Sequence, residues 1–310
     1  MKKWQGDLVF ILIVALAIGG WFSLYPRQGD SLLSPLTPPV ELNIEPRIYA
    51  SPYGERLAYR LYEPPGEVDA VLVLLHDTLL HGAWYAELGY GLAKEGIAVY
   101  APDRRGWGHS IGDHRQGAQD VDVLMQDIEA MIFAAHARYP LKELFLGGHG
   151  RGAGLVLQYV NAQRPVSGVV LIAPYIADGQ PNLDRAGWRQ FVQVHPVEAF
   201  LAQSGLFDWP VWRYQWPKSM TEVDPLLETT GAISWMRETT PDDLEAAFAV
   251  PGPLLCVYGD ADPLFDADKA PDLLDLFATP DKQLELVAGA DYLGVLTAGV
   301  KPIADWVRGR

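Results

Sequence analysis

From residue 47 onward, short apolar runs alternate with longer segments whose apolar residues recur at helical spacing, and this alternation limits the possible folds more than any other feature. Val71–Leu75 and Ile97–Ala101 are continuous apolar runs, as expected of strands buried on both faces, whereas Val121–Arg138 carries an apolar helical stripe. Arg56–Tyr62 alternates between apolar and polar residues, which predicts an edge or antiparallel strand. Further strands are predicted at Leu144–Gly147, Val169–Ala173, Pro253–Tyr258 and Gln283–Val287, and helices at Trp84–Lys94 and Arg151–Asn161. The sequence therefore predicts a mostly parallel sheet with helices on both faces.

The segment 175–250 interrupts this alternation and is predicted to be an insertion that forms a cap over one end of the sheet. It holds half of the tryptophans of the chain, namely Trp188, Trp209, Trp212, Trp216 and Trp235. Tryptophans in such a place can line an apolar pocket or contact lipid headgroups. The favoured interpretation is that most of them form the small core of the cap itself.

Composition and charge exclude several classes of protein. Apolar residues make up 49% of the 310 residues, which is enough for a buried core and excludes an intrinsically disordered chain. The net charge of −15 argues against nucleic-acid binding, because neutralising phosphates needs a basic face. A single cysteine, Cys256, excludes a disulfide framework and a cysteine-based zinc cluster. Neither a metal site nor a cofactor is expected.

Residues 1–25 are predicted to form a cytoplasmic tip and an N-terminal transmembrane helix. Residues 8–25 contain no charged residue, and as a helix they would span roughly 27 Å, close to the thickness of the hydrocarbon core of a membrane. Aromatic rings that favour the interface lie near the ends of this run at Trp4, Trp21 and Tyr25, and two lysines precede it. This pattern predicts a cytoplasmic N-terminus and a domain on the periplasmic or extracellular side. The alternatives are a cleaved signal peptide and a buried helix.

Residues 26–46 contain five prolines and are predicted to form a semi-rigid stalk, because proline fixes φ and removes a hydrogen-bond donor. The alternative is that this stretch packs along the surface of the domain. Residues 47–310 are then one domain that includes the cap.

Two motifs lie close together in residues 74–110. The first is His76 followed by Asp77, directly after a predicted strand. The second is a D-x-R-G-x-G-x-S turn after the next strand, formed by Asp103, Arg105, Gly106, Gly108 and Ser110. This region resembles the start of an α/β-hydrolase, and the closest subgroup is that of monoacylglycerol lipases, lysophospholipases and serine aminopeptidases. These proteins carry the same turn, but they have a His-Gly pair where this chain has His76 and Asp77.

Residues 144–159 combine a predicted strand, a turn and a helix, which is the setting of a nucleophile elbow of the form G-x-S-x-G. The chain reads Gly148-His149-Gly150-Arg151-Gly152, so that Gly150 stands at the nucleophile position. The resemblance also places the triad carboxylate at Asp262 and the triad histidine position at Tyr292. It covers about residues 47–174 and 251–310 and implies an α/β-hydrolase fold.

These substitutions predict the loss of Ser-His-Asp chemistry. Gly150 supplies no attacking oxygen, and Tyr292, with an ordinary pKa near 10, is a poor proton acceptor at neutral pH. The resemblance implies that the backbone N–H groups of Thr78 and Arg151 form an oxyanion hole. Asp77 would place a negative charge close to that hole and oppose acyl transfer, unless its side chain points away.

Three histidines lie where they could approach such a site. His76 and His149 occupy positions at which the resemblance implies structural histidines, whereas His195 belongs to the predicted cap. Residues 263–310 contain no histidine, so a shifted alignment does not restore the base.

The sequence favours a membrane-anchored, catalytically degenerate α/β-hydrolase-like protein that binds a small apolar or acyl ligand, or a protein partner, through its pocket and cap. One alternative is an active hydrolase of lipid esters or lysophospholipids, with activated water as the nucleophile and Asp262, Asp291 or His195 as the base. Another is an accessory subunit of a larger membrane complex.

Overall fold

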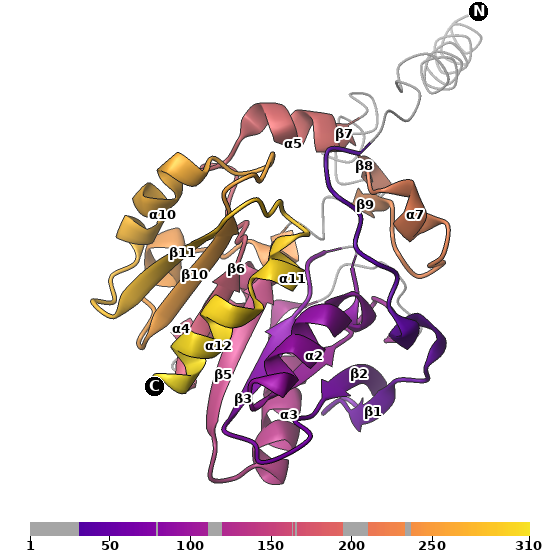
Figure 1. Cartoon of the computed structure of the whole chain (residues 1–310), viewed down its shortest axis with the longest axis vertical. Helices are drawn as coiled ribbons and strands as arrows, with labels where there is room; N and C mark the ends of the chain where they lie inside the picture. Colours follow the sequence, from indigo (N-terminus) through magenta and orange to yellow (C-terminus); the bar gives the residue numbers. More distant parts are fainter. Residues whose placement is uncertain are drawn as a thin grey trace, which may run out of the picture.

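The computed structural model describes residues 31–78, 80–110, 120–162, 164, 166–194, 210–232 and 237–310. An eight-stranded sheet runs through the molecule in the order β1-β2-β4-β3-β5-β6-β10-β11 (Figure 1). Its strands are β1 (Arg47–Ala50), β2 (Arg56–Tyr62), β3 (Ala70–Leu75), β4 (Ile97–Pro102), β5 (Glu143–His149), β6 (Gly168–Ile172), β10 (Leu254–Gly259) and β11 (Lys282–Val287).

The pairing in this sheet is mostly parallel. β1 pairs antiparallel with β2, and β2 pairs antiparallel with β4. All pairs from β4 across to β11 are parallel, which confirms the predicted architecture. Strand β2 was expected as an edge or antiparallel strand. It is antiparallel but lies inside the sheet, because the unpredicted β1 covers its outer side.

Helices cover both faces of the sheet (Figure 1). On one face α2 (Ala86–Lys94), α11 (Val295–Ala298) and α12 (Val300–Arg308) pack together, and on the other α3 (Val121–Arg138) packs against α4 (Gly152–Asn161). The remaining helical segments of this core are α10 (Ala270–Leu276) beside β11 and the 3-10 turns η1 (Val40–Asn43), η2 (Gly82–Tyr85) and η3 (Ala267–Lys269). Because both faces are covered, β3, β4 and β10 are buried along their whole length.

The cap contains a second sheet that the sequence did not predict. Strands β7 (Val192–Val194), β8 (Pro210–Tyr214) and β9 (Thr230–Ala232) pair antiparallel, accompanied by the helices α5 (Arg185–Phe191), α7 (Lys218–Thr221) and α9 (Leu244–Ala247). Trp216 is buried and Trp188 is half-buried, and both rings pack edge-on against Phe191. These two tryptophans therefore belong to the packing of the cap. Trp209 and Trp235 lie outside the described residues.

Residues 31–46, which we call the strap, lie against the domain instead of leading away from it as a stalk. Leu33 and Leu36 are buried in the core. The Ser31 hydroxyl donates to the Gln215 carbonyl (2.6 Å), and the Ser34 N–H donates to Asp291 Oδ2 (2.5 Å). The leucines account for this difference, because removing their side chains from water stabilises the packed arrangement.

The predicted anchor, residues 8–25, falls outside the described residues, and so does His195. In the described part of the chain, no helix has both the length and the apolar character that crossing a membrane requires.

Candidate active site

The turn after β5 has the form of a nucleophile elbow. Strand β5 ends at His149, Gly150 follows with a φ of +53°, and α4 begins two residues later. The Gly150 N–H donates to the Ile172 carbonyl (3.0 Å), and the Gly150 carbonyl accepts from the Tyr175 N–H (3.0 Å). A positive φ strains most residues but not glycine, so this turn is held without backbone strain and without a nucleophilic side chain.

The two predicted oxyanion-hole donors converge on one atom, and that atom belongs to the protein. Asp77 Oδ1 accepts from the Thr78 N–H (2.7 Å) and from the Arg151 N–H (2.8 Å). Asp77 is 6% exposed, so little water competes for these bonds. The side chain does not point away from the hole, as one interpretation of the sequence allowed. Its carboxylate occupies the place where the oxyanion of an acyl-transfer intermediate would form.

Tyr292 completes the same arrangement. It lies in the turn between β11 and α11, is fully buried, and donates its hydroxyl hydrogen to Asp77 Oδ2 (2.7 Å). Burial and the nearby Asp77 charge raise the pKa of Tyr292 well above its ordinary value, so the phenol keeps its proton. Asp77 thus accepts three hydrogen bonds, from the Thr78 and Arg151 N–H groups and from the Tyr292 hydroxyl.

Gly150 is the third member of this group. A Cβ at position 150 would overlap the Tyr292 hydroxyl and would lie 2.5 Å from Asp77 Cγ. The structure therefore brings Gly150, Asp77 and Tyr292 together as one interdependent arrangement. Any side chain at position 150 would displace either the phenol or the carboxylate.

Asp262, in the turn after β10, is close to this group but has lost the partner that a triad acid orients. Its Oδ1 accepts from the Leu264 N–H (2.8 Å), whereas its buried Oδ2 has no hydrogen-bond partner among the described residues. Burial, and to a lesser extent the neighbouring Asp291 charge, raise the pKa of Asp262 to about 8. A triad acid normally faces an imidazole, but the phenol of Tyr292 is engaged by Asp77.

Residues 66–291 match the family described as serine aminopeptidase, S33. The chain belongs to this family. It is 27% identical over 258 residues to a monoglyceride lipase of Homo sapiens, in an alignment that covers 77% of this chain and 80% of that protein. It is 26% identical over 255 residues to a monoacylglycerol lipase of Mycolicibacterium smegmatis, in an alignment that covers 78% of this chain and 87% of that protein.

Solved structures agree with the serine aminopeptidase assignment at the level of the fold. A soluble variant of monoglyceride lipase from Saccharomyces cerevisiae, in complex with a substrate analog, superposes with a TM-score of 0.67 at 15% identity and covers 90% of this chain and 98% of that chain. A monoacylglycerol lipase of Paleococcus ferrophilus gives a TM-score of 0.57 at 22% identity, with coverages of 82% and 98%. The α/β-hydrolase fold predicted from the sequence is therefore confirmed.

The two described histidines of this serine aminopeptidase-like site act as fixed hydrogen-bonding groups. His76 Nδ1 bonds the Asp77 carbonyl (2.6 Å) and His76 Nε2 accepts from the Arg104 N–H (2.9 Å). His149 Nε2 bonds the Tyr292 carbonyl (3.1 Å). Burial lowers the pKa of both imidazoles, which keeps them neutral. Neither ring has a free nitrogen that would accept a proton from a substrate or from water.

Tyr85 is a member of this network that sequence reasoning missed. Its hydroxyl accepts from the Asp77 N–H (2.8 Å) and bonds His149 Nδ1 (2.8 Å). Tyr85 therefore links the loop after β3 to the end of β5. A tyrosine near the start of a helix carries no sequence signal for such a role. Ser34, which fixes Asp291 from the strap, is equally without a signal.

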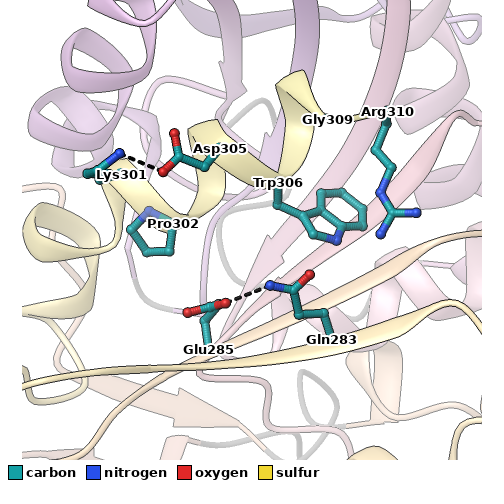
Figure 2. Close-up of a pocket in the computed structure, with 8 residues that line it drawn as sticks. All are labelled: Gln283, Glu285, Lys301, Pro302, Asp305, Trp306, Gly309 and Arg310. Carbon is teal, nitrogen blue, oxygen red and sulfur yellow. Dashed lines mark hydrogen bonds and ion pairs between the residues drawn. The ribbon is translucent and has the colours of Figure 1, made fainter.

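No group of histidine, cysteine or acidic side chains within the described ranges is arranged to hold a metal ion. A surface groove of about 530 Å³ lies between β11 and α12, and none of the residues that line it belongs to the candidate site (Figure 2). Two of its charged residues, Lys301 and Asp305, pair with each other (2.6 Å). The groove is thus separate from the candidate site.

Proposed function

We propose that this chain is a membrane-anchored member of the serine aminopeptidase S33 family that has lost serine-hydrolase chemistry and acts by binding. The observation that carries the proposal is the Asp77 carboxylate, which accepts from both oxyanion-hole donors and from the Tyr292 hydroxyl. A substrate carbonyl cannot use donors that a buried carboxylate already holds.

Each requirement of acyl transfer fails at this site for a separate reason. An attacking oxygen is absent at Gly150. The group at the base position, Tyr292, is a buried phenol that holds its proton and donates it to Asp77. The carboxylate in the hole would repel a developing oxyanion instead of stabilising it. Because all three changes meet in one network, restoring a single residue would not restore the reaction.

The ligand we favour is a small apolar or acyl compound, or the apolar surface of a protein partner, that contacts the cap. Two features support this choice. The sequence relatives are named as lipases of monoacylglycerols. Aromatic rings also gather at the junction of the cap and the site, where Trp188 packs against Tyr175, Phe265 and Tyr292.

Membrane attachment is the second part of the proposal. It is supported by the uncharged run at residues 8–25 and by the lysines that precede it. The domain would then lie on the periplasmic or extracellular side.

The test is an acyl-ester hydrolysis assay on the full chain in mild detergent, with a monoacylglycerol and a short-chain ester as substrates. We expect release of fatty acid no faster than in the matched Asp262→Asn variant, and no labelling by a serine-reactive phosphonate. Turnover that the Asp262→Asn substitution abolishes would contradict the proposal.

A rearranged hydrolase is the second candidate, and one observation favours it. Asp262 Oδ2 has no partner among the described residues, and its pKa of about 8 suits a general base near neutral pH. Such an enzyme would use an activated water. It would release product without a covalent intermediate, with a rate that rises as pH passes through about 8.

A further inference from the structure

Two buried arginine side chains lie at the edge of the sheet that carries the candidate site, and the arrangement described above uses neither of them. Arg104 follows β4 and Arg151 follows β5, with β3 between these two strands. The three strands are parallel, so both arginines lie at their carboxyl ends, two strand spacings or about 10 Å apart across the sheet. Arg104 is 8% exposed and Arg151 is 5% exposed.

Three guanidinium nitrogens of these residues have no hydrogen-bond partner among the described residues, namely Arg104 Nε, Arg104 Nη1 and Arg151 Nη1. Arginine keeps its charge even when it is buried, and its nitrogens can only donate. A buried donor without an acceptor destabilises the fold, because the same group is hydrogen-bonded to water in the unfolded chain. A concentration of such donors at one edge of the sheet therefore indicates a site for an acceptor from outside the chain.

The neighbouring carboxylates do not supply that acceptor. Burial lowers the pKa of Arg104, whereas the charges of Glu238 and Asp77 counteract this effect, so both carboxylates are near Arg104. Asp77 nevertheless accepts from two backbone N–H groups and from the Tyr292 hydroxyl, and Glu238 bonds neither Arg104 Nε nor Arg104 Nη1. Because the two carboxylates would repel a dianion, a ligand with a single negative charge suits this place best.

An apolar surface adjoins the Arg151 guanidinium. Arg151 Cζ lies 3.9 Å from the centroid of the Tyr175 ring, and this ring packs edge-on against Trp188 with centroids 4.7 Å apart. Trp188 is half-buried, and its Nε1 is a further buried donor without a partner in the described part of the chain. Charged donors and aromatic rings are therefore adjacent at the junction of the cap and the site.

We propose that these groups form a binding site for the anion of a fatty acid, in which Arg151 and Arg104 donate to the carboxylate and the acyl chain lies over Trp188. The proposal rests on the binding function proposed above and selects an acyl anion among the ligands considered there. Hydrogen bonds from a guanidinium to a carboxylate are shorter and stronger than those to a neutral oxygen. A neutral ester or alcohol would leave the two buried charges without a charged acceptor.

The first test compares an anion with a neutral compound of the same number of carbons, using the full chain in mild detergent. Octanoate and 1-octanol are titrated in a calorimeter. We expect 1-octanol to bind at least about tenfold more weakly than octanoate, because it lacks the charge that the guanidinium groups recognise. Equal affinities for the two compounds would contradict the proposal. So would the absence of octanoate binding, which is the result expected if water alone satisfies the arginines.

The second test removes one guanidinium. Arg151→Met keeps an unbranched side chain against Tyr175 but has no charge. Arg164→Met is the matched control, because Arg164 also lies over a tyrosine, Tyr159 (5.1 Å), but its Nη1 bonds Glu129 (2.7 Å).

After melting curves show that both variants are folded, Arg151→Met is expected to weaken octanoate binding at least about tenfold and Arg164→Met to leave it unchanged. Equal affinities in the two variants would show that Arg151 does not hold the carboxylate. If Arg151→Met does not fold, the comparison of octanoate with 1-octanol on the parent chain decides the point by itself. Octanoate has no ester bond, so its binding is measured independently of the hydrolysis that the ester assay tests.

Discussion

At the scale of single residues, the candidate site is defined by three side-chain changes that depend on one another. Asp77 fills the oxyanion hole, Tyr292 donates to it, and Gly150 leaves the space that both need. None of these changes is easily tolerated alone. A serine at position 150 excludes the phenol, and without the phenol Asp77 loses one of its three donors. The three residues therefore depend on one another, which is why the proposed loss of hydrolase chemistry differs from the loss of a single group.

We expect Gly150→Ala to lower the free energy of unfolding by roughly 3 kcal/mol. The alanine would have a strained positive φ, and its Cβ would overlap Tyr292 and Asp77. Gly289→Ala is the matched control, because Gly289 also has a positive φ (+71°) but a Cβ there meets no atom within 4 Å. Its cost should be about 1 kcal/mol. The measurement is thermal melting in detergent. Equal losses in the two variants would show that the space at position 150 is not restricted.

The raised pKa of Asp262 predicts a pH-dependent loss of stability. Because the folded-state pKa is about 8 and the ordinary value is 3.8, the folded chain holds a proton that the unfolded chain releases between these values. Asp262 therefore destabilises the fold increasingly as pH rises from about 4 to about 8. Asp262→Asn should be more stable than the parent chain, and by a larger margin at pH 9 than at pH 5.

The comparison with Asp262→Asn is needed because buried histidines act in the opposite direction. His76 and His149 have lowered pKa values, so they add stability at neutral pH that is lost on acidification. Both variants carry these histidines, and their contribution cancels in the difference. A difference in melting temperature that stays constant from pH 5 to pH 9 would contradict the assignment to Asp262.

The sequence could locate Gly150, Asp262 and Tyr292, because each lies in a local motif at a strand end. It could not decide where the Asp77 side chain points. That direction is set by a bond to Tyr292, which is 215 residues away, and by the N–H of Arg151, directly before α4. Interactions at such separation leave no trace in local periodicity.

At the scale of elements, the strap is the main departure from expectation. The prolines predict an extended backbone, but Val40–Asn43 within the strap form the 3-10 turn η1. Prolines also carry no information about what the backbone lies against. The two buried leucines and the Ser34–Asp291 bond hold the strap to the edge of the candidate site. This element therefore contributes to the stability of the domain.

The strap predicts that Leu33→Ala lowers the stability of the domain by about 2–4 kcal/mol, because it removes a side chain that is 3% exposed. Val40→Ala, in η1 of the same strap, is the control, since Val40 is 68% exposed. Its effect should stay within about 0.5 kcal/mol. Melting curves of the two variants test this prediction. Equal, small shifts in melting temperature would mean that the strap does not pack on the domain.

At the scale of the whole molecule, the alternation of strands and helices was sufficient to predict the central sheet and the bounds of α3. The strands of the cap and β1 were not predicted, because they are three to five residues long and lack the long continuous apolar runs that mark β3, β4 and β6. Their positions depend on the large sheet that they pack against. The function proposed above would mean that this chain keeps the scaffold of a hydrolase around a centre that lacks the serine and histidine of Ser-His-Asp chemistry.

The most direct test of this account compares two reconstructed variants in the ester hydrolysis assay, after melting curves show that both are folded. Gly150→Ser with Tyr292→His supplies the missing nucleophile and base but keeps Asp77 in the oxyanion hole. Adding Asp77→Gly frees the Thr78 and Arg151 N–H groups. The account predicts measurable hydrolysis only in the triple variant. A double variant that hydrolyses ester as fast as the triple one would show that Asp77 does not block the hole.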